Sequence, residues 1–138
     1  MNTDRLGLGE QTVLYEQLTE KIIGCAFKVS NSLGCGFLEK VYENALAHEL
    51  RKAGVSVQQQ VAMKVHYDGI IVGEYVADIL VENTIILELK AISSFDKVHT
   101  AVCLNYLKAT NKEIALLINF GKPRLEYKRI IAIGTIEE

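Results

Sequence analysis

The stretch EYVADILVENTIILELKA, residues 74–91, determines the fold that the sequence predicts. It contains two apolar segments, each typical of a strand, joined by the short turn ENT at residues 82–84. Three charged residues, Asp78, Glu88 and Lys90, interrupt these apolar segments. A buried charge is costly unless it is paired or bound to a metal, so these residues are the first candidates for a functional site.

The length of the turn decides whether Asp78 and Glu88 share a face of the sheet. With the three-residue turn ENT, Val81 pairs with Ile85, and Asp78 then lies opposite Glu88 on the same face. The two Cβ atoms would be about 4.5–5.5 Å apart. A two-residue loop would place the carboxylates on opposite faces. We favour the three-residue turn. Lys90 is on the face of Glu88 whatever the turn, because side chains alternate along a strand.

The rest of the chain predicts one layered α/β/α domain with a central mixed sheet of about five strands. Residues 1–13 are expected to form a flexible tail, and residues 14–138 a single domain. Apolar residues at spacings of three and four indicate helices, and alternating or continuous apolar runs indicate strands. The expected order is helix 14–33, helix 37–53, strand 55–67, strand 70–81, strand 85–92, helix 95–110 capped by Ser93 or Ser94, strand 113–120 and strand 125–134.

Composition excludes several classes of protein. The chain has 138 residues, of which 49% are hydrophobic and 23% charged, as in a globular domain. Its net charge of −2 excludes a strongly basic nucleic-acid binder, so any such contact is expected from a local patch or with the help of a metal ion. No apolar run approaches the ~20 residues that span a membrane. The three cysteines form no CxxC pair, which predicts reduced thiols in a cytoplasmic protein.

The acidic residues predict a magnesium site. Two facing carboxylates repel each other, and a divalent cation held by one or two acids and by waters relieves that repulsion. Glu39 falls between Leu46 and Leu50 on the wheel of the second helix, which places a third acid within its apolar arc. Two alternatives are open: the charges belong to a solvated face, or they form a structural ion network.

Two motifs resemble a known family. Asp78, nine residues and then Glu88-Leu89-Lys90 resemble the PD-(D/E)xK phosphodiesterase signature. The segment GFLEKVY matches G-x-x-E-x-x-Y through Gly36, Glu39 and Tyr42. Together, over about residues 16–133, they resemble the GxxExxY family, a small bacterial and archaeal branch of the PD-(D/E)xK superfamily. The segments LTEKIIG, YENALAHELRKAG and LLINFG are similar as well.

This resemblance implies a restriction-endonuclease-like fold and metal-dependent cleavage of DNA or RNA. Asp78, Glu88 and the carbonyl of Leu89 would bind Mg²⁺, with Mn²⁺ as a substitute, and Glu39 would reach the metal, directly or through a water. Lys90 would assist the attacking water. Tyr42 would orient Glu39 or contact a phosphate; the alternative is a core aromatic residue whose hydroxyl is satisfied.

One departure from the family pattern favours a second interpretation. Many relatives have a Gln where this chain has Val102, and Val cannot form a hydrogen bond with a substrate. The second interpretation is therefore a catalytically weak or inactive nuclease-fold module that binds nucleic acid or protein.

Further residues on the later part of the chain are weaker candidates. Tyr106 is a candidate auxiliary residue, and apolar residues on two sides of the helix at 95–110 favour a homodimer. A basic cluster would contact a phosphate backbone, or would be an ordinary solvated turn. Its candidate contact residues are Lys97, Lys122, Arg124 and Lys128.

Overall fold

The hairpin at the centre of the prediction forms with the expected register. In the computed structural model, which describes residues 8–132, β2 (Ile70–Val81) and β3 (Ile85–Lys90) are antiparallel. Val81 pairs with Ile85 across residues 82–84, which confirms the three-residue turn. Glu82 and Asn83 both have positive φ, 51° and 55°, a conformation that Asn tolerates better than most residues.

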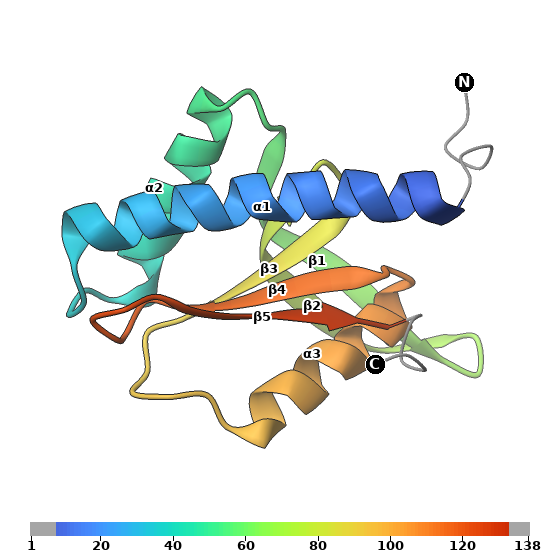
Figure 1. The fold of residues 1–138 in the computed structure, drawn as a ribbon. Helices are drawn as coiled ribbons and strands as arrows, with labels where there is room; N and C mark the ends of the chain where they lie inside the picture. The colour runs from blue at the N-terminus through green and yellow to red at the C-terminus, as the bar shows by residue number, and fades with distance from the viewer. Residues whose placement is uncertain (1–7, 133–138) are drawn as a thin grey trace.

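The described chain contains three helices and five strands in the expected order (Figure 1). Besides β2 and β3, they are α1 (Leu8–Leu33), α2 (Glu39–Lys52), β1 (Val57–Tyr67), α3 (Lys97–Thr110), β4 (Ile114–Asn119) and β5 (Glu126–Ile131).

The sheet is mixed and lies between two layers of helices. Its strand order is β1-β2-β3-β4-β5. Only β3 and β4 are parallel, and α3 forms the crossover that a parallel connection requires. Helices α1 and α2 cover one face of the sheet and α3 covers the other (Figure 1). The predicted three-layer architecture is therefore confirmed.

Each face of the sheet has its own apolar core. On the α1–α2 face, Ile79, Leu87 and Leu116 pack with Ile22 and Leu46 of the helices. On the α3 face the core is smaller, and its buried residues are Tyr75, Ala77, Leu80, Ile86, Cys103, Leu107, Ala115, Leu117 and Ile130. Strand β4 is buried along its whole length, as a strand covered on both faces should be.

Two helix starts differ from the sequence prediction. Helix α1 begins at Leu8, so residues 8–13, predicted as part of a flexible tail, are helical. The segment has no proline, and its Leu, Glu and Gln are good helix formers. Residues 1–7 of that tail lie outside the described residues. Helix α3 is capped by Asp96 rather than by Ser93 or Ser94, and the His99 side chain completes a capping box.

The exposed surface of α3 includes apolar side chains. Val98 is 54% exposed and Val102 is 46% exposed. This agrees with the expected second apolar surface on the helix, while a homodimer stays a prediction. Within residues 8–132, no helix combines the length and the apolar character needed to cross a membrane.

Candidate functional site

The candidate site lies where β2 and β3 separate. The two strands pair only over residues 79–81 and 85–87, whereas β3 continues beside β4 as far as Lys90. The last residues of β3 are therefore open on the side that β2 leaves. The backbone N–H of Leu89 faces this gap and donates a hydrogen bond of 2.8 Å to Oδ2 of Asp78. Asp78 is thus not paired directly opposite Glu88, as the sequence predicted, but bonds to Leu89, the residue between Glu88 and Lys90.

An irregularity in β1 and β2 sets the position of Asp78. Residues an even number of positions apart on a regular strand share a face. In β1, however, Val57 packs on the α1–α2 face and Val61 on the α3 face. In β2, Ile79 packs on the α1–α2 face and Ala77 on the α3 face. Both strands therefore change face between these positions, at Gln60 and Asp78. Gln60 has a φ of 54°, in the left-handed region that residues with a side chain rarely adopt. Strict alternation does not predict this change of face.

Glu88 is held on the α3 face by a tyrosine that the sequence did not single out. The hydroxyl of Tyr75 donates a hydrogen bond to Oε2 of Glu88. The Tyr75 ring stacks on Tyr106, with centroids 4.0 Å apart and planes 14° from parallel. Tyr75 lies on the α3 face because of the change of face at Asp78, so no simple periodicity could have found it.

A small cavity opens beside Glu88 and Lys90. Its volume is about 100 Å³. The predicted auxiliary residue Tyr106 lines it, and so does Val102. Its full lining is Tyr75, Glu88, Lys90, Val98, His99, Val102, Cys103, Tyr106 and Leu117. Because the walls are mainly apolar, Glu88 and Lys90 supply its charge.

Burial and repulsion raise the pKa of both carboxyls. Burial raises the pKa of Glu88 to about 7; the charge of Asp78 adds to this, and the Tyr75 hydroxyl and Lys90 oppose it. Burial also raises the pKa of Asp78. The hydrogen bond from the Leu89 N–H lowers this pKa, and the negative charges of Glu43 and Glu39 raise it further. Glu88 is therefore only partly ionised at neutral pH. A cation bound beside it would lower this pKa and favour the ionised carboxylate.

The raised pKa of Glu88 predicts that stability falls as pH rises. An unfolded Glu ionises near pH 4.5 and the folded Glu88 near 7, so the folded state binds more protons between these values. The free energy of unfolding should therefore fall through this window by on the order of 3 kcal/mol, since each pH unit of difference is worth about 1.4 kcal/mol. Urea unfolding from pH 4.5 to 8 measures the slope, which Glu88→Gln should reduce to the part that the raised pKa of Asp78 contributes. An unchanged slope in that variant would contradict the assignment.

Glu39 lies on the side of α2 that carries Leu46 and Leu50, as the helical wheel predicted, but it is exposed and not among buried apolar residues. It is the first residue of α2, at the end of the helix where its side chain is not covered. The buried acid of this helix is Glu43, one turn later and 4% exposed. The spacing from Glu43 to Leu46, Ala47 and Leu50 was the signal that could have found it.

Tyr42 is a core residue rather than a partner of Glu39. Its hydroxyl donates to the carbonyl of Gly34 at 2.6 Å and accepts from the N–H of Phe37 at 3.2 Å. Its ring stacks on Phe120 at 4.7 Å. This is the alternative left open by the sequence, and it shows that the Tyr of the G-x-x-E-x-x-Y motif fixes the loop before α2.

The chain beyond Lys90 is fixed by the loop that follows β4. The side chain of Asn119 is fully buried and bonds with both the N–H and the carbonyl of Ile92, each at 3.0 Å. Its Oδ1 also accepts from the N–H of Gly121 at 2.9 Å. A Cβ on Gly121 would lie 2.4 Å from the backbone of Ile92. The LLINFG segment therefore holds the end of β3, and Lys90 with it.

This packing predicts that Gly121→Ala destabilises the fold. The added methyl must displace backbone, which typically costs about 1–3 kcal/mol. Gly73→Ala is a matched control, because a Cβ there meets no heavy atom within 4 Å and Gly73 has no positive φ. Urea unfolding of the two variants measures the difference. Equal stability of both variants would contradict the close approach.

Of the predicted phosphate contacts, Lys128 lies nearest the site in the sheet. Glu88 pairs with Leu117, and Leu117 pairs with Lys128, so the three form a row across β3, β4 and β5. Lys122 forms an ion pair with Glu126 at 3.7 Å. Lys97 begins α3, and Arg124 lies in the β4–β5 connection. Their contact with nucleic acid stays a prediction.

The donor set suits a hard divalent cation. Asp78 and Glu88 provide two carboxyls whose ionisation is opposed by burial and by the charges of neighbouring acids, and Mg²⁺ needs only one or two protein carboxylates. The N–H and C=O of one strand residue point to the same side, so the Leu89 carbonyl also faces the gap. However, among residues 8–132 no three His, Cys, Asp or Glu side chains form a metal-binding group, so Glu39 does not complete a three-acid site.

Comparison with known proteins gave a family match and a similarity to a solved structure. The crystal structure of SSO0001 is similar, with 18% identity and a TM-score of 0.49 over 67% of this chain. The match covers 50% of that structure, so this chain spans about half its length. No curated protein sequence matches the chain. A family model described as the PD-(D/E)XK nuclease superfamily matches residues 16–130, nearly the whole chain. The chain therefore belongs to the PD-(D/E)XK nuclease superfamily.

Proposed function

We propose that this chain is a divalent-metal-dependent phosphodiesterase that cleaves DNA or RNA in the cytoplasm. The observation that carries the proposal is the gap at the end of β3, where Asp78 bonds to the N–H of Leu89 and its charge and that of Lys90 both act on the pKa of Glu88. Two carboxyls with raised pKa values gain charge and lose their mutual repulsion when a cation binds. Membership of a nuclease superfamily supports the same chemistry.

Each group at the gap has a role in this proposal. Asp78, Glu88 and the Leu89 carbonyl hold Mg²⁺ or Mn²⁺, and exposed Glu39 contributes through a water. The bound ion supplies the positive charge that polarises the phosphate and activates a water. Lys90 donates hydrogen bonds to that water or to the phosphate and stabilises the added negative charge. In the cleavage step a water oxygen would bond to phosphorus and release a proton to solvent, the opposite P–O bond would break, and the leaving oxygen would take a proton from solvent.

We also propose that the chain belongs to the GxxExxY branch. Gly36 has a φ of 117°, which only glycine adopts without strain, and Tyr42 fixes the loop around it. Gly36 and Tyr42, the first and last residues of the motif, thus have structural roles that explain why they are Gly and Tyr.

A second candidate function is a binding module without catalytic activity. It is favoured by Val102, which lines the cavity in place of a hydrogen-bonding residue, and by the Tyr75 hydroxyl, which occupies an oxygen of Glu88.

The two functions are separated by Mn²⁺ titration calorimetry together with incubation of labelled single- and double-stranded DNA and RNA. A nuclease should bind Mn²⁺ and cleave at least one of these substrates. Binding of nucleic acid with no cleavage in Mg²⁺ or Mn²⁺ would favour the second function. Neither metal binding nor cleavage would overturn the proposed function.

A further inference from the structure

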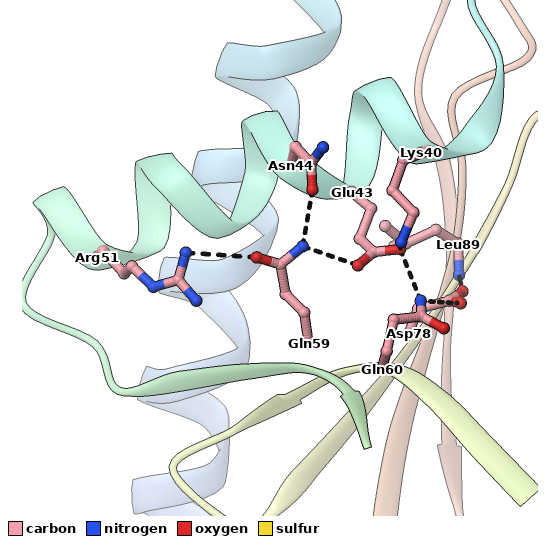
Figure 2. A network of polar contacts seen from close by, with 8 residues as sticks. All are labelled: Lys40, Glu43, Asn44, Arg51, Gln59, Gln60, Asp78 and Leu89. Carbon is pink, nitrogen blue, oxygen red and sulfur yellow. Dashed lines mark hydrogen bonds and ion pairs between the residues drawn. The ribbon is translucent and has the colours of Figure 1, made fainter. Parts of the chain in front are cut away.

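The buried carboxylate of Glu43 is the centre of a network that neither the fold nor the predicted site explains (Figure 2). It is 4% exposed, and its two oxygens accept three hydrogen bonds from three side chains: Lys40 and Gln60 on Oε1, at 3.0 and 2.8 Å, and Gln59 on Oε2, at 2.7 Å. A buried carboxylate needs such partners, so the acceptors of Glu43 are satisfied.

Two neighbouring glutamines of β1 contact Glu43, but only one reaches the site. The Gln59 amide nitrogen donates to Glu43 and to Asn44, at 2.8 Å from Asn44 Oδ1, both on α2. The Gln60 amide nitrogen donates to Glu43 and lies 3.5 Å from Oδ1 of Asp78. Figure 2 shows this amide between the two carboxylates. Gln60 therefore links α2 to Asp78, whereas Gln59 links α2 only to β1.

The backbone of Gln60 adds an independent observation. Its φ of 54° is unfavourable for a residue with a side chain, and such strain persists where the surrounding structure holds it in place. Gln60 is also the residue at which β1 changes face, opposite Asp78. The strained backbone thus directs the amide toward Asp78, whose other oxygen is held by the Leu89 N–H at 2.8 Å.

We propose that Gln60, anchored by Glu43, is a positioning residue that fixes the orientation of the Asp78 carboxylate at the end of β3. One oxygen of Asp78 is held by the Leu89 backbone and the other by the Gln60 amide, so the carboxylate cannot rotate freely. The proposal rests on the proposed function for its effect on catalysis, but its effect on Asp78 exists without metal or substrate.

The test compares Gln60→Ala with Gln59→Ala. Each variant removes one amide bond to Glu43, and alanine keeps a Cβ, so Gln60→Ala adds no new backbone strain. The amide signal of Leu89 in NMR spectra of the metal-free protein reports its hydrogen bond to Asp78. Gln60→Ala should shift this signal and speed its hydrogen exchange, whereas Gln59→Ala should leave both unchanged. Glu43→Gln should reproduce the effect and add little to it in the double variant with Gln60→Ala.

With the proposed function in place, Gln60→Ala should weaken Mn²⁺ binding or lower kcat about 10–100-fold, the usual effect of a group that orients a metal ligand. An unchanged Leu89 signal in Gln60→Ala, or equal changes in both glutamine variants, would overturn the positioning role. A wild-type protein that binds no Mn²⁺ would overturn the proposed function while the Leu89 comparison still decides the role of Gln60.

Discussion

Asp78→Asn should abolish Mn²⁺ binding and lower cleavage at least about 10³-fold, a loss of about 4 kcal/mol of transition-state stabilisation. Asn is nearly the same size, and its side-chain oxygen can still accept the Leu89 N–H bond. The variant therefore removes the charge of the ligand and keeps the Leu89 bond, at the loss of the long 3.5 Å contact in which the other Asp78 oxygen accepts from Gln60. Calorimetric titration with Mn²⁺ and single-turnover cleavage assays measure the two effects.

The same substitution should not destabilise the metal-free fold. Burial and the nearby acids raise the pKa of Asp78, so its charge is unfavourable in the folded state and its removal should leave stability equal or higher. It should also lower the pKa of Glu88, which the charge of Asp78 helps to raise. If the variant lost activity because it unfolds, urea unfolding would instead show a lower free energy of unfolding than that of the wild type.

Asp68→Asn provides the matched control. Asp68 is an exposed residue of the β1–β2 turn with a φ of 55°, and Asn tolerates that conformation at least as well as Asp. It makes the same change of charge away from the gap. Equal loss of Mn²⁺ binding in both variants would mean that the ion responds to net charge and not to a site at Asp78.

The parts of the fold that depend on local periodicity could be predicted from the sequence. The three-residue turn fixed the register of β2 and β3, and the continuous apolar run of β4 indicated a strand buried on both faces. The register and the alternation of side chains predicted that Asp78 and Glu88 lie close together, but the pairing of β2 and β3 ends at Ile79 and Leu87, and Asp78 reaches the end of β3 through the N–H of Leu89 instead.

The parts that depend on departures from periodicity could not. Both β1 and β2 change face at Gln60 and Asp78, which places Tyr75 against Glu88 and the Gln60 amide beside Asp78. No two-residue pattern contains that change. The burial of Glu39 was wrongly predicted for a different reason. A helical wheel gives the direction of a side chain but not where the helix begins, and Glu39 is the first residue of α2.

Lys90→Met should separate catalysis from metal binding. Met keeps much of the length of the side chain and removes its charge, so a group that stabilises charge on the phosphate or assists the water is lost. We expect kcat to fall about 10²–10⁴-fold, the range for a positioned catalytic group. Mn²⁺ should bind as tightly or more tightly, because a positive charge beside Asp78 and Glu88 is gone.

The metal-free protein allows a second test of Lys90→Met. Lys90 lowers the pKa of Glu88, so Lys90→Met should raise that pKa above 7 and extend the fall in stability to higher pH. Lys64→Met is the matched control, since Lys64 is exposed on β1 and pairs only with Glu74 among the described ion pairs, at 3.7 Å. If Lys90→Met loses Mn²⁺ binding together with activity, Lys90 organises the carboxylates instead of acting on the substrate. The charge of Lys90 would then belong to the structure of the site, and the water and phosphate would have to be activated by the bound cation alone.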